Sequence, residues 1–253
     1  MNGMQMSPEF RLFSPETGTD YRIYVEIPTD ESAEAGLWPV VLLLDGDDQF
    51  PAGVEAYRAL RAVGAVRPLL LVGVGYGASY REPQNRRGRD YTPVAHGDEP
   101  TSGGADAFLG FLTARLWPEL NRRYPVDESV RGIAGHSLGS LLVLHALFQT
   151  APFFTHHLAS APSIWWADRA LLGVVERLRL SQAGLRARLF LGVGEEDSES
   201  MTGDLALLEA QLKKRPFAEL EVRSKQFPRR NHFNVLPDAF SAGFETLFGT
   251  RTK

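Results

Sequence analysis

Short runs of apolar residues recur along the chain. A strand inside a parallel sheet is buried on both faces, so it reads as a near-continuous apolar run. The segment Tyr21–Pro28 instead alternates like a half-buried strand, and with the residues around Phe10–Phe13 it predicts an edge hairpin. Buried strands are predicted at Val40–Gly46, Leu69–Gly75, Gly132–Ser137, Leu158–Trp166 and Arg188–Gly194, with a last candidate strand at Glu219–Phe227.

Stretches with helical spacing lie between these strands. In Ala105–Tyr124, for example, apolar residues recur three or four positions apart, which is typical of a helix with one buried face. Strands that alternate with helices predict an α/β fold with a mostly parallel central sheet and helices on both faces. The alternation is consistent, so we expect residues 1–253 to form a single domain. The other predicted helices are Val54–Val63, Leu138–Gln149, Arg169–Arg179, Leu205–Lys214 and Leu236–Leu247.

One long stretch, from about residue 77 to residue 104, has no apolar periodicity. It is rich in Gly, Pro, Arg, Asp and Asn, and it follows the carboxyl end of a predicted parallel strand. Ligands bind at that end of open α/β sheets. We interpret the stretch as a substrate-side loop, and a solvated insertion is the alternative.

Composition narrows the function classes. The chain is 43% hydrophobic and 23% charged, with a formal net charge of -4, so it predicts no binding to nucleic acid or to an anionic membrane. The absence of cysteine excludes disulfides, thiolate metal sites and a cysteine nucleophile. No apolar run approaches the roughly 18 residues of a membrane span, and the first residues lack the features of a signal peptide. The default expectation is a cytoplasmic protein.

The pentapeptide GHSLG at residues 135–139 matches the G-x-S-x-G pattern around a nucleophilic serine. The match alone is weak, because roughly one random chain in ten of this length contains such a pentapeptide. Here it ends an apolar run and opens a helix, which is the strand–turn–helix context of a nucleophile elbow. Gly135 and Gly139 leave room for the tight turn. We therefore predict Ser137 as the nucleophile, against the alternative of an ordinary tight turn.

A serine hydroxyl needs a base to take its proton. In α/β-hydrolases the chain order is serine, acid, histidine. His232 alone among the six histidines follows every candidate acid, in a loop between the last predicted strand and the last predicted helix. His136 is expected to point away from the serine hydroxyl and to act in packing or hydrogen bonding.

The acid is expected after the strand that ends at Gly194. Asp197 has the Gly-x-x-acid spacing that is common there, and its neighbours Glu196 and Glu195 have similar reach. Asp168 is a more distant alternative, and a solvated acidic helix start is the non-catalytic one.

Two backbone N–H groups are expected to bind the oxyanion. One belongs to Leu138, the residue after the nucleophile, and the other lies in the segment that follows the strand at 40–46. Gly46 permits a tight turn there, so we predict the N–H of Asp47. The segment DGDD at 45–48 lacks the remaining ligand pattern of a calcium loop, so no metal and no cofactor is expected.

These motifs together resemble the esterase D-like branch of the α/β-hydrolases, and within it the enterobactin esterase type, which opens trilactone siderophores. The matching segments run in family order from about residue 40 to residue 237. They are VVLLLDGDDQF, RGRDYTP, GGADAFLGFLTARLWPELNRRYPVD, IAGHSLGSLLVLHALF, APSIWW, FLGVGEED and NHFNVLP.

The resemblance implies roles for further residues. It implies that Trp165 and Trp166 line the site and that Arg89 and Tyr91 lie beside its mouth. Two adjacent tryptophans on a strand face opposite sides, so one of them is expected in the core. Some members of this type are described as Ser/His dyads, which leaves the acid open. Ser140 departs from the family, whose members more often have a second glycine there.

Four guanidinium groups lie close together in the long loop. Such a cluster suits an anionic substrate and equally suits a solvated basic face. The arginines are Arg81, Arg86, Arg87 and Arg89.

The sequence therefore predicts a serine esterase that hydrolyses a small-molecule carboxylic ester, with a siderophore trilactone as one candidate substrate. The alternatives are a thioesterase such as S-formylglutathione hydrolase, a sugar acetyl or feruloyl esterase, an acyltransferase and a non-catalytic binding member. The oligomeric state is left open.

Overall fold

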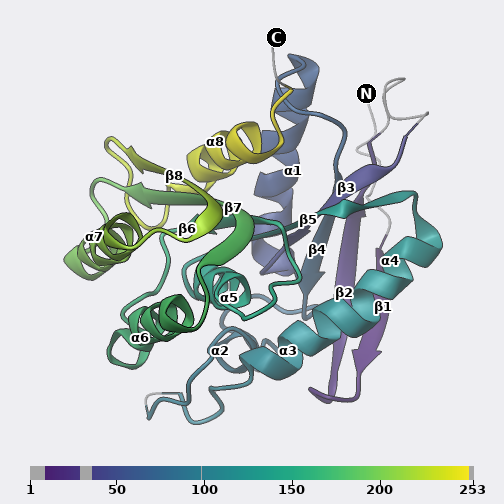
Figure 1. The fold of residues 1–253 in the computed structure, drawn as a ribbon. Coiled ribbons are helices and arrows are strands. Elements are labelled where there is room, and N and C mark those ends of the chain that lie inside the picture. The colour runs from purple at the N-terminus through teal and green to yellow at the C-terminus, as the bar shows by residue number, and fades with distance from the viewer. Residues whose placement is uncertain (1–8, 29–35, 98, 251–253) are drawn as a thin grey trace.

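One eight-stranded sheet runs through the part of the chain that the computed structural model describes, residues 9–28, 36–97 and 99–250 (Figure 1). The strands lie in the order β1-β2-β4-β3-β5-β6-β7-β8. Their bounds are β1 Glu9–Ser14, β2 Thr19–Glu26, β3 Trp38–Leu43, β4 Leu70–Gly75, β5 Val126–His136, β6 His156–Ser160, β7 Gly184–Gly194 and β8 Ala218–Phe227.

The sheet is mostly parallel. β2 pairs antiparallel with both β1 and β4, and the strands from β4 across to β8 pair in parallel. This arrangement confirms the predicted fold class. The edge hairpin is also confirmed, because Phe10 of β1 pairs with Ile23 of β2.

Helices cover both faces of the sheet (Figure 1). α1 and α8 pack against each other over one face, while α3, α5, α6 and α7 contribute to a second core on the opposite face. The helices are α1 Gly46–Ala62, α2 Arg87–Asp90, α3 Ala105–Phe111, a π-helical turn at Leu112–Leu116, α4 Trp117–Arg123, α5 Leu138–Leu147, α6 Trp166–Ser181, α7 Glu199–Lys214 and α8 Leu236–Phe248.

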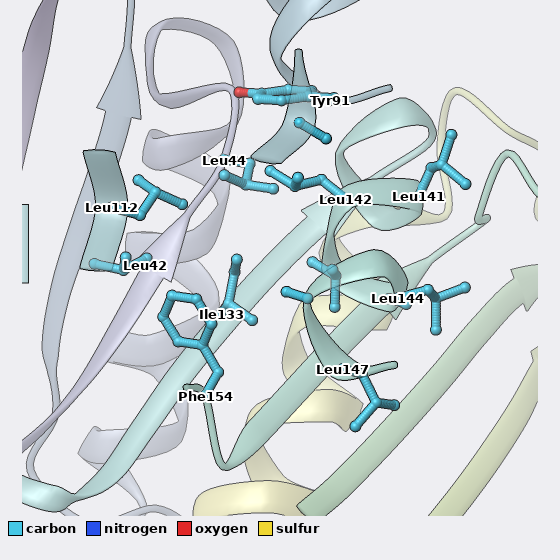
Figure 2. Packing of buried hydrophobic residues seen from close by; sticks show 14 of the residues in the cluster. Leu42, Leu44, Tyr91, Leu112, Ile133, Leu141, Leu142, Leu144, Leu147 and Phe154 are labelled. Carbon is cyan, nitrogen blue, oxygen red and sulfur yellow. The ribbon is translucent and has the colours of Figure 1, made fainter. Parts of the chain in front are cut away.

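The core beneath α5 supports the end of β5. Figure 2 shows Ile133 of β5 and leucines of α5 within one apolar cluster that also holds Leu42 and Leu44. α5 is largely apolar on all sides, and all of its residues from Gly139 to Leu147 are buried. A helix that is apolar on all sides belongs in a core. The turn between β5 and α5 is therefore held from both ends by packing.

The prediction of a strand over Leu158–Trp166 is wrong at both ends. β6 ends at Ser160, and it begins at His156, so His156 and His157 lie inside the strand. Ala161 has a positive φ of 44°, and Pro162 has no N–H to donate to a neighbouring strand. The chain therefore leaves the sheet after Ser160, and the two tryptophans do not lie on a strand.

Two other boundaries differ from the pattern. α1 begins at Gly46, eight residues before the predicted start. The pattern missed its first turn because that turn is polar. The turn carries Asp47 and Asp48, and carboxylates are favoured at a helix N-terminus. The helix predicted over Ala105–Tyr124 forms almost in full, with one π-helical turn in its middle.

None of the described helices is both long enough and apolar enough to cross a membrane. The cytoplasmic location and the single-domain boundary at 1–253 stay predictions.

Candidate active site

Ser137 occupies a strained turn between β5 and α5. Its backbone has φ 58° and ψ −121°, a region that residues with a side chain rarely adopt. The N–H of Ser137 donates to Ser160 O on β6 at 3.0 Å, which fixes the turn at the carboxyl end of the sheet. A Cβ on Gly135 would lie 2.6 Å from the carbonyl carbon of Gly139, so the turn closes only with glycine at 135. The requirement at Gly139 is weaker, since the nearest atom to a Cβ there is 3.3 Å away.

Ser140 secures the same turn through its side chain. It is fully buried, and its Oγ lies 2.6 Å from Gly135 O and 2.8 Å from Ser160 O, so its single hydrogen is donated to one of these carbonyls. The departure from the family's glycine thus adds a link between the elbow and β6.

The hydroxyl of Ser137 contacts a second serine. Its Oγ lies 3.3 Å from the Oγ of Ser163, whose backbone N–H donates to Ser137 O at 3.3 Å. Among the described residues, Ser137 Oγ makes no hydrogen bond to His232. The sequence pattern did not indicate Ser163. This serine lies near Ser137 because the chain turns out of the sheet at Ala161, directly after β6.

His232 pairs with Asp197. The Nδ1 of His232 lies 3.2 Å from Asp197 Oδ2, and the other oxygen of Asp197 accepts the N–H of Ser198 at 2.8 Å. The Asp197 side chain is only 2% exposed, whereas that of His232 is 23% exposed. The nearly buried carboxylate therefore engages Nδ1 and leaves Nε2 as the ring nitrogen of His232 that is outside this contact.

The other candidate acids do not reach His232. Glu195 and Glu196 are exposed, and the carboxylate of Glu195 instead accepts the backbone N–H of Arg229 at 3.2 Å. Asp168 is exposed at the start of α6, where its φ is 53°. Of the four residues considered from the sequence, the structure brings Asp197 alone to the histidine.

Backbone contacts bring the acid and histidine segments together. A Cβ on Gly194, at the end of β7, would lie 2.2 Å from Arg230 O, so the two segments touch where Gly194 has no side chain. The N–H of Glu196 donates to the same Arg230 carbonyl at 2.8 Å. The glycine at 194 therefore permits the approach that places Asp197 beside His232.

The imidazole ring of His136 packs against that of His232. The two rings lie 4.6 Å apart between centroids, and Nδ1 of His136 is 3.0 Å from Ser160 Oγ. Burial, with additional repulsion from His232 and Arg87, lowers the pKa of His136 to about 3. His136 is therefore neutral at neutral pH, and it packs against His232 and contacts Ser160 Oγ.

The carboxyl end of β3 lies beside the elbow. β3 pairs in parallel with β5, and the N–H of Leu44 donates to Ala134 O at 3.0 Å. Asp45 has φ 53°, and its carbonyl accepts the N–H groups of Asp48 and Gln49. In the described part of the chain, the N–H groups of Gly46, Asp47 and Leu138 have no partner. These are the free N–H groups at the starts of α1 and α5.

A buried ion pair lies next to these N–H groups. Arg87 donates from Nε to Asp45 Oδ1 at 2.8 Å and from Nη2 to Asp45 Oδ2 at 3.1 Å. Desolvation lowers the pKa of Arg87, but the carboxylate of Asp45 outweighs it, so the pKa is raised above its usual value. Arg87 also lies 4.8 Å from the ring centroid of Tyr80. The pair ties the segment 77–104 to the start of α1.

Arg89 and Tyr91, which were expected beside the mouth of the site, both make contacts within the protein. Tyr91 is fully buried, and its hydroxyl accepts the N–H of Asp45 at 2.9 Å. Arg89 turns toward β2, where it donates to Asp90, to Thr17 O and to Thr19 Oγ1. Tyr91 therefore supports the Asp45 segment from inside the protein, Arg89 is bound to β2, and Arg87 is the arginine of the loop that binds Asp45.

The two tryptophans differ in environment. Trp166 is 6% exposed and donates its indole N–H to Val94 O at 2.8 Å, so it anchors the long loop. Trp165 is 41% exposed and follows Ser163 by two residues. As expected, one of the pair is in the core, but the cause is a turn and not a strand.

The described residues contain no group of three or more His, Cys, Asp or Glu side chains that suits a metal ion. In the DGDD segment, the carboxylate of Asp47 is occupied by the hydroxyl of Tyr24 and by the N–H groups of Tyr76 and Gly77.

The mostly parallel eight-stranded sheet, with the strand–turn–helix elbow at Ser137, defines an α/β-hydrolase fold. The family model described as "Putative esterase" matches residues 14–235, so the chain belongs to this esterase family and is a carboxylic-ester hydrolase.

Individual relatives agree with the family assignment. Ferri-bacillibactin esterase BesA of Bacillus subtilis is 30% identical, over 90% of this chain and 85% of the relative. The siderophore triacetylfusarinine C esterase of Aspergillus fumigatus is 34% identical, over 62% of this chain and 56% of the relative. Among solved structures, the BES protein from Bacillus cereus superposes with a TM-score of 0.85 at 28% identity, covering 97% of this chain and 95% of that chain.

Proposed function

We propose that this esterase cleaves ester bonds of a siderophore lactone, with Ser137 as nucleophile, His232 as general base and Asp197 as the acid that orients it. The observation that carries the catalytic assignment is the His232–Asp197 pair, whose imidazole lies against His136, the residue before a serine held at positive φ at the carboxyl end of β5. Relatives named as esterases of ferri-bacillibactin, triacetylfusarinine C and salmochelin support the substrate class.

The reaction begins with a rotation of the Ser137 hydroxyl away from Ser163 and toward Nε2 of His232. Catalytic hydrogen bonds are often long before substrate binds and tighten in the complex. His232 takes the proton as Oγ attacks the ester carbonyl carbon, and Asp197 stabilises the resulting imidazolium. His232 then gives that proton to the leaving alcohol. Water, deprotonated by His232, attacks the acyl-enzyme and releases the acid and the free serine.

The tetrahedral oxyanion is bound by the N–H of Leu138 and by the N–H of Asp47 or Gly46. Free N–H groups at helix starts suit a negative charge, and each such donor is worth about 10²–10³ in kcat in comparable sites. Asp45 and Arg87 fix the backbone from which the second donor projects.

Exposed aromatic side chains around the site suit an aromatic acyl group. Phe233 is 92% exposed and contacts the ring of His232 edge-on at 5.7 Å between centroids. Trp165 and Tyr80 are further exposed aromatic groups, and the Tyr80 ring lies against Arg87, whose charge is paired with Asp45. We propose Phe233, Trp165 and Tyr80 as substrate-binding residues.

A fluorophosphonate probe and an ester panel test the proposal. The native chain should be labelled, the Ser137→Ala variant should not, and Ser200→Ala, which removes an exposed serine of α7, should be labelled like the native chain. The panel contains a trilactone siderophore, a cinnamoyl ester, an acetylated sugar, S-formylglutathione and p-nitrophenyl acetate.

Absence of labelling in the native chain would contradict the catalytic assignment. Activity on the siderophore that does not exceed activity on p-nitrophenyl acetate would contradict the substrate class and leave the catalytic assignment standing.

A further inference from the structure

A hollow lies at the opposite end of the sheet from Ser137. It has a volume of about 820 Å³ and lies at the amino ends of β5 to β8. Arg131 of this hollow and Ser137 are six residues apart along the same extended segment, roughly 20 Å at about 3.3 Å per residue. The hollow is therefore separate from the candidate active site. Its charged lining consists of Arg67, Arg131, Arg186, Arg188, Glu219 and Glu221, with His156 beside them.

The lining carries an excess of positive charge. Four arginines and two glutamates give a net charge of two positive, on a chain whose formal net charge is -4. Asp127 is a further carboxylate in the neighbourhood, and its Oδ1 accepts the N–H and the hydroxyl of Ser129. With Asp127 included, the net charge of this region is one positive, on a chain that is negative overall.

The arginines differ in how well they are paired. Arg188 lies 3.2 Å from Glu221. Arg131 donates to the carbonyl oxygens of Phe153 and Glu128. Among the described residues, the side chains of Arg67 and Arg186 have no hydrogen-bond or ion-pair partner. Arg67 is half-buried, and a half-buried guanidinium has lost part of its hydration without a partner to replace it.

The cations also act on one another. Burial lowers the pKa of Arg67, and Arg188 lowers it further against the opposing effect of Asp127. Burial together with Arg188 and Arg67 lowers the pKa of His156 to about 4, so His156 is neutral at neutral pH. Its ring stacks on Phe248 at 5.1 Å between centroids, which gives the hollow one apolar wall.

We propose that this hollow binds a phosphate-class oxyanion, either inorganic phosphate or a phosphomonoester, between the guanidinium groups of Arg67 and Arg188. A guanidinium presents paired N–H donors that match two oxygens of one phosphate, and charge-assisted bonds of this kind are among the strongest in proteins. Arg186 lies at the exposed rim and adds to the attraction. The proposal is independent of the ester-cleaving site.

Calorimetric titration of the full chain with inorganic phosphate, at constant ionic strength in chloride, tests the proposal. We expect saturable binding by the native chain, at least tenfold weaker binding by Arg67→Gln and unchanged binding by Arg177→Gln, which removes an exposed arginine of α6. Arg186→Gln, a change at the exposed rim, should weaken binding by a smaller factor and provides a second variant if Arg67→Gln does not fold. Titration with a sugar phosphate separates the two sources, since tighter binding than phosphate identifies a monoester.

Two results would overturn the proposal. One is no saturable binding by the native chain. The other is binding that survives Arg67→Gln and Arg186→Gln unchanged and inhibits ester hydrolysis competitively, because the anion would then occupy the active site.

Discussion

Asp197 and Glu196 are neighbours in the sequence, yet their carboxylates lie in different environments. That of Asp197 is nearly buried and bonded to a histidine and to a backbone N–H, whereas Glu196 is exposed. A buried carboxylate with fixed geometry can hold an imidazole in one tautomer, and an exposed one cannot. The difference gives the two residues separable effects on the reaction.

Replacing Asp197 by Asn should lower kcat/KM for ester hydrolysis by about 10²–10⁴, because the amide neither fixes the tautomer nor stabilises the imidazolium. Glu196→Gln is the matched control and should change kcat/KM less than twofold. Initial rates on p-nitrophenyl acetate measure both. Full activity in Asp197→Asn would mean that Ser137 and His232 act as a dyad.

Single residues also mark where the sequence pattern was sufficient. The candidates Ser137 and His232 were selected from a motif and from chain order, which depend on sequence alone and not on tertiary contacts. Arg87 and Arg89 could not be told apart, since both lie on the one-turn helix α2 and tertiary contacts alone decide that Arg87 reaches Asp45.

At the scale of elements, two turns hold the backbone in strained conformations near the site. One is the elbow between β5 and α5. The other is the start of α6, where Ala167, Asp168 and Arg169 all have φ between 48° and 64°. A left-handed residue with a Cβ costs roughly 1–2 kcal/mol. Arg169 is held by a 2.6 Å bond to Asp204 of α7, which helps to fix the turn that follows Trp165 and Trp166.

Two glycine-to-alanine changes, one in the elbow and one in α3, should have opposite effects on the free energy of unfolding. Gly135→Ala should destabilise the chain by about 3 kcal/mol or more, because its Cβ would overlap the backbone of Gly139. Gly110→Ala in α3, where a Cβ meets nothing within 4 Å, should stabilise it by up to about 1 kcal/mol. Urea unfolding of both variants measures the free energies. Equal effects would show that the elbow relaxes more easily than its geometry indicates.

The left-handed turn predicts a second pair of opposite effects. Ala167→Gly should raise the free energy of unfolding by about 0.5–1 kcal/mol, because glycine adopts positive φ without strain. Ala170→Gly, three residues later in the regular part of α6, should lower it by about 1 kcal/mol. The midpoints of thermal unfolding report the signs. A loss of stability in both variants would contradict the strain at Ala167.

The elements also show why part of the site escaped prediction. An apolar run gives the approximate place of a buried strand but not the residue at which the chain turns out of the sheet. That limit misplaced Trp165 and Trp166 on a strand and concealed Ser163, which reaches the nucleophile only because β6 ends at Ser160.

For the whole molecule, buried histidines link folding to pH. His136 and His157 have pKa values lowered to about 3, and His156 has one lowered to about 4, in each case chiefly by burial. The unfolded chain binds these protons near pH 6.5. Between about pH 4 and 6.5 the unfolded chain therefore holds more protons than the folded chain. The contribution of these histidines to the free energy of unfolding is fully present above this range and is lost as the pH decreases through it.

His157→Gln should make that dependence less steep. Removing one buried histidine removes about one proton from the difference between the folded and unfolded states, or about 1.4 kcal/mol per pH unit near pH 5. Urea unfolding at pH 4.5, 5.5, 7 and 8 measures the slope. Between pH 7 and pH 8 the two chains should give parallel curves, and an unchanged slope near pH 5 would contradict the assignment.

The two ends of the central sheet carry different chemistry. The candidate ester-cleaving residues lie at the carboxyl ends of the strands, and the arginine-lined hollow lies at the amino ends. A chain attached to a sulfonated bead or electrode through the arginine-lined end would direct Ser137 toward the bulk solution. Oriented immobilisation would therefore leave the face that receives the ester unobstructed.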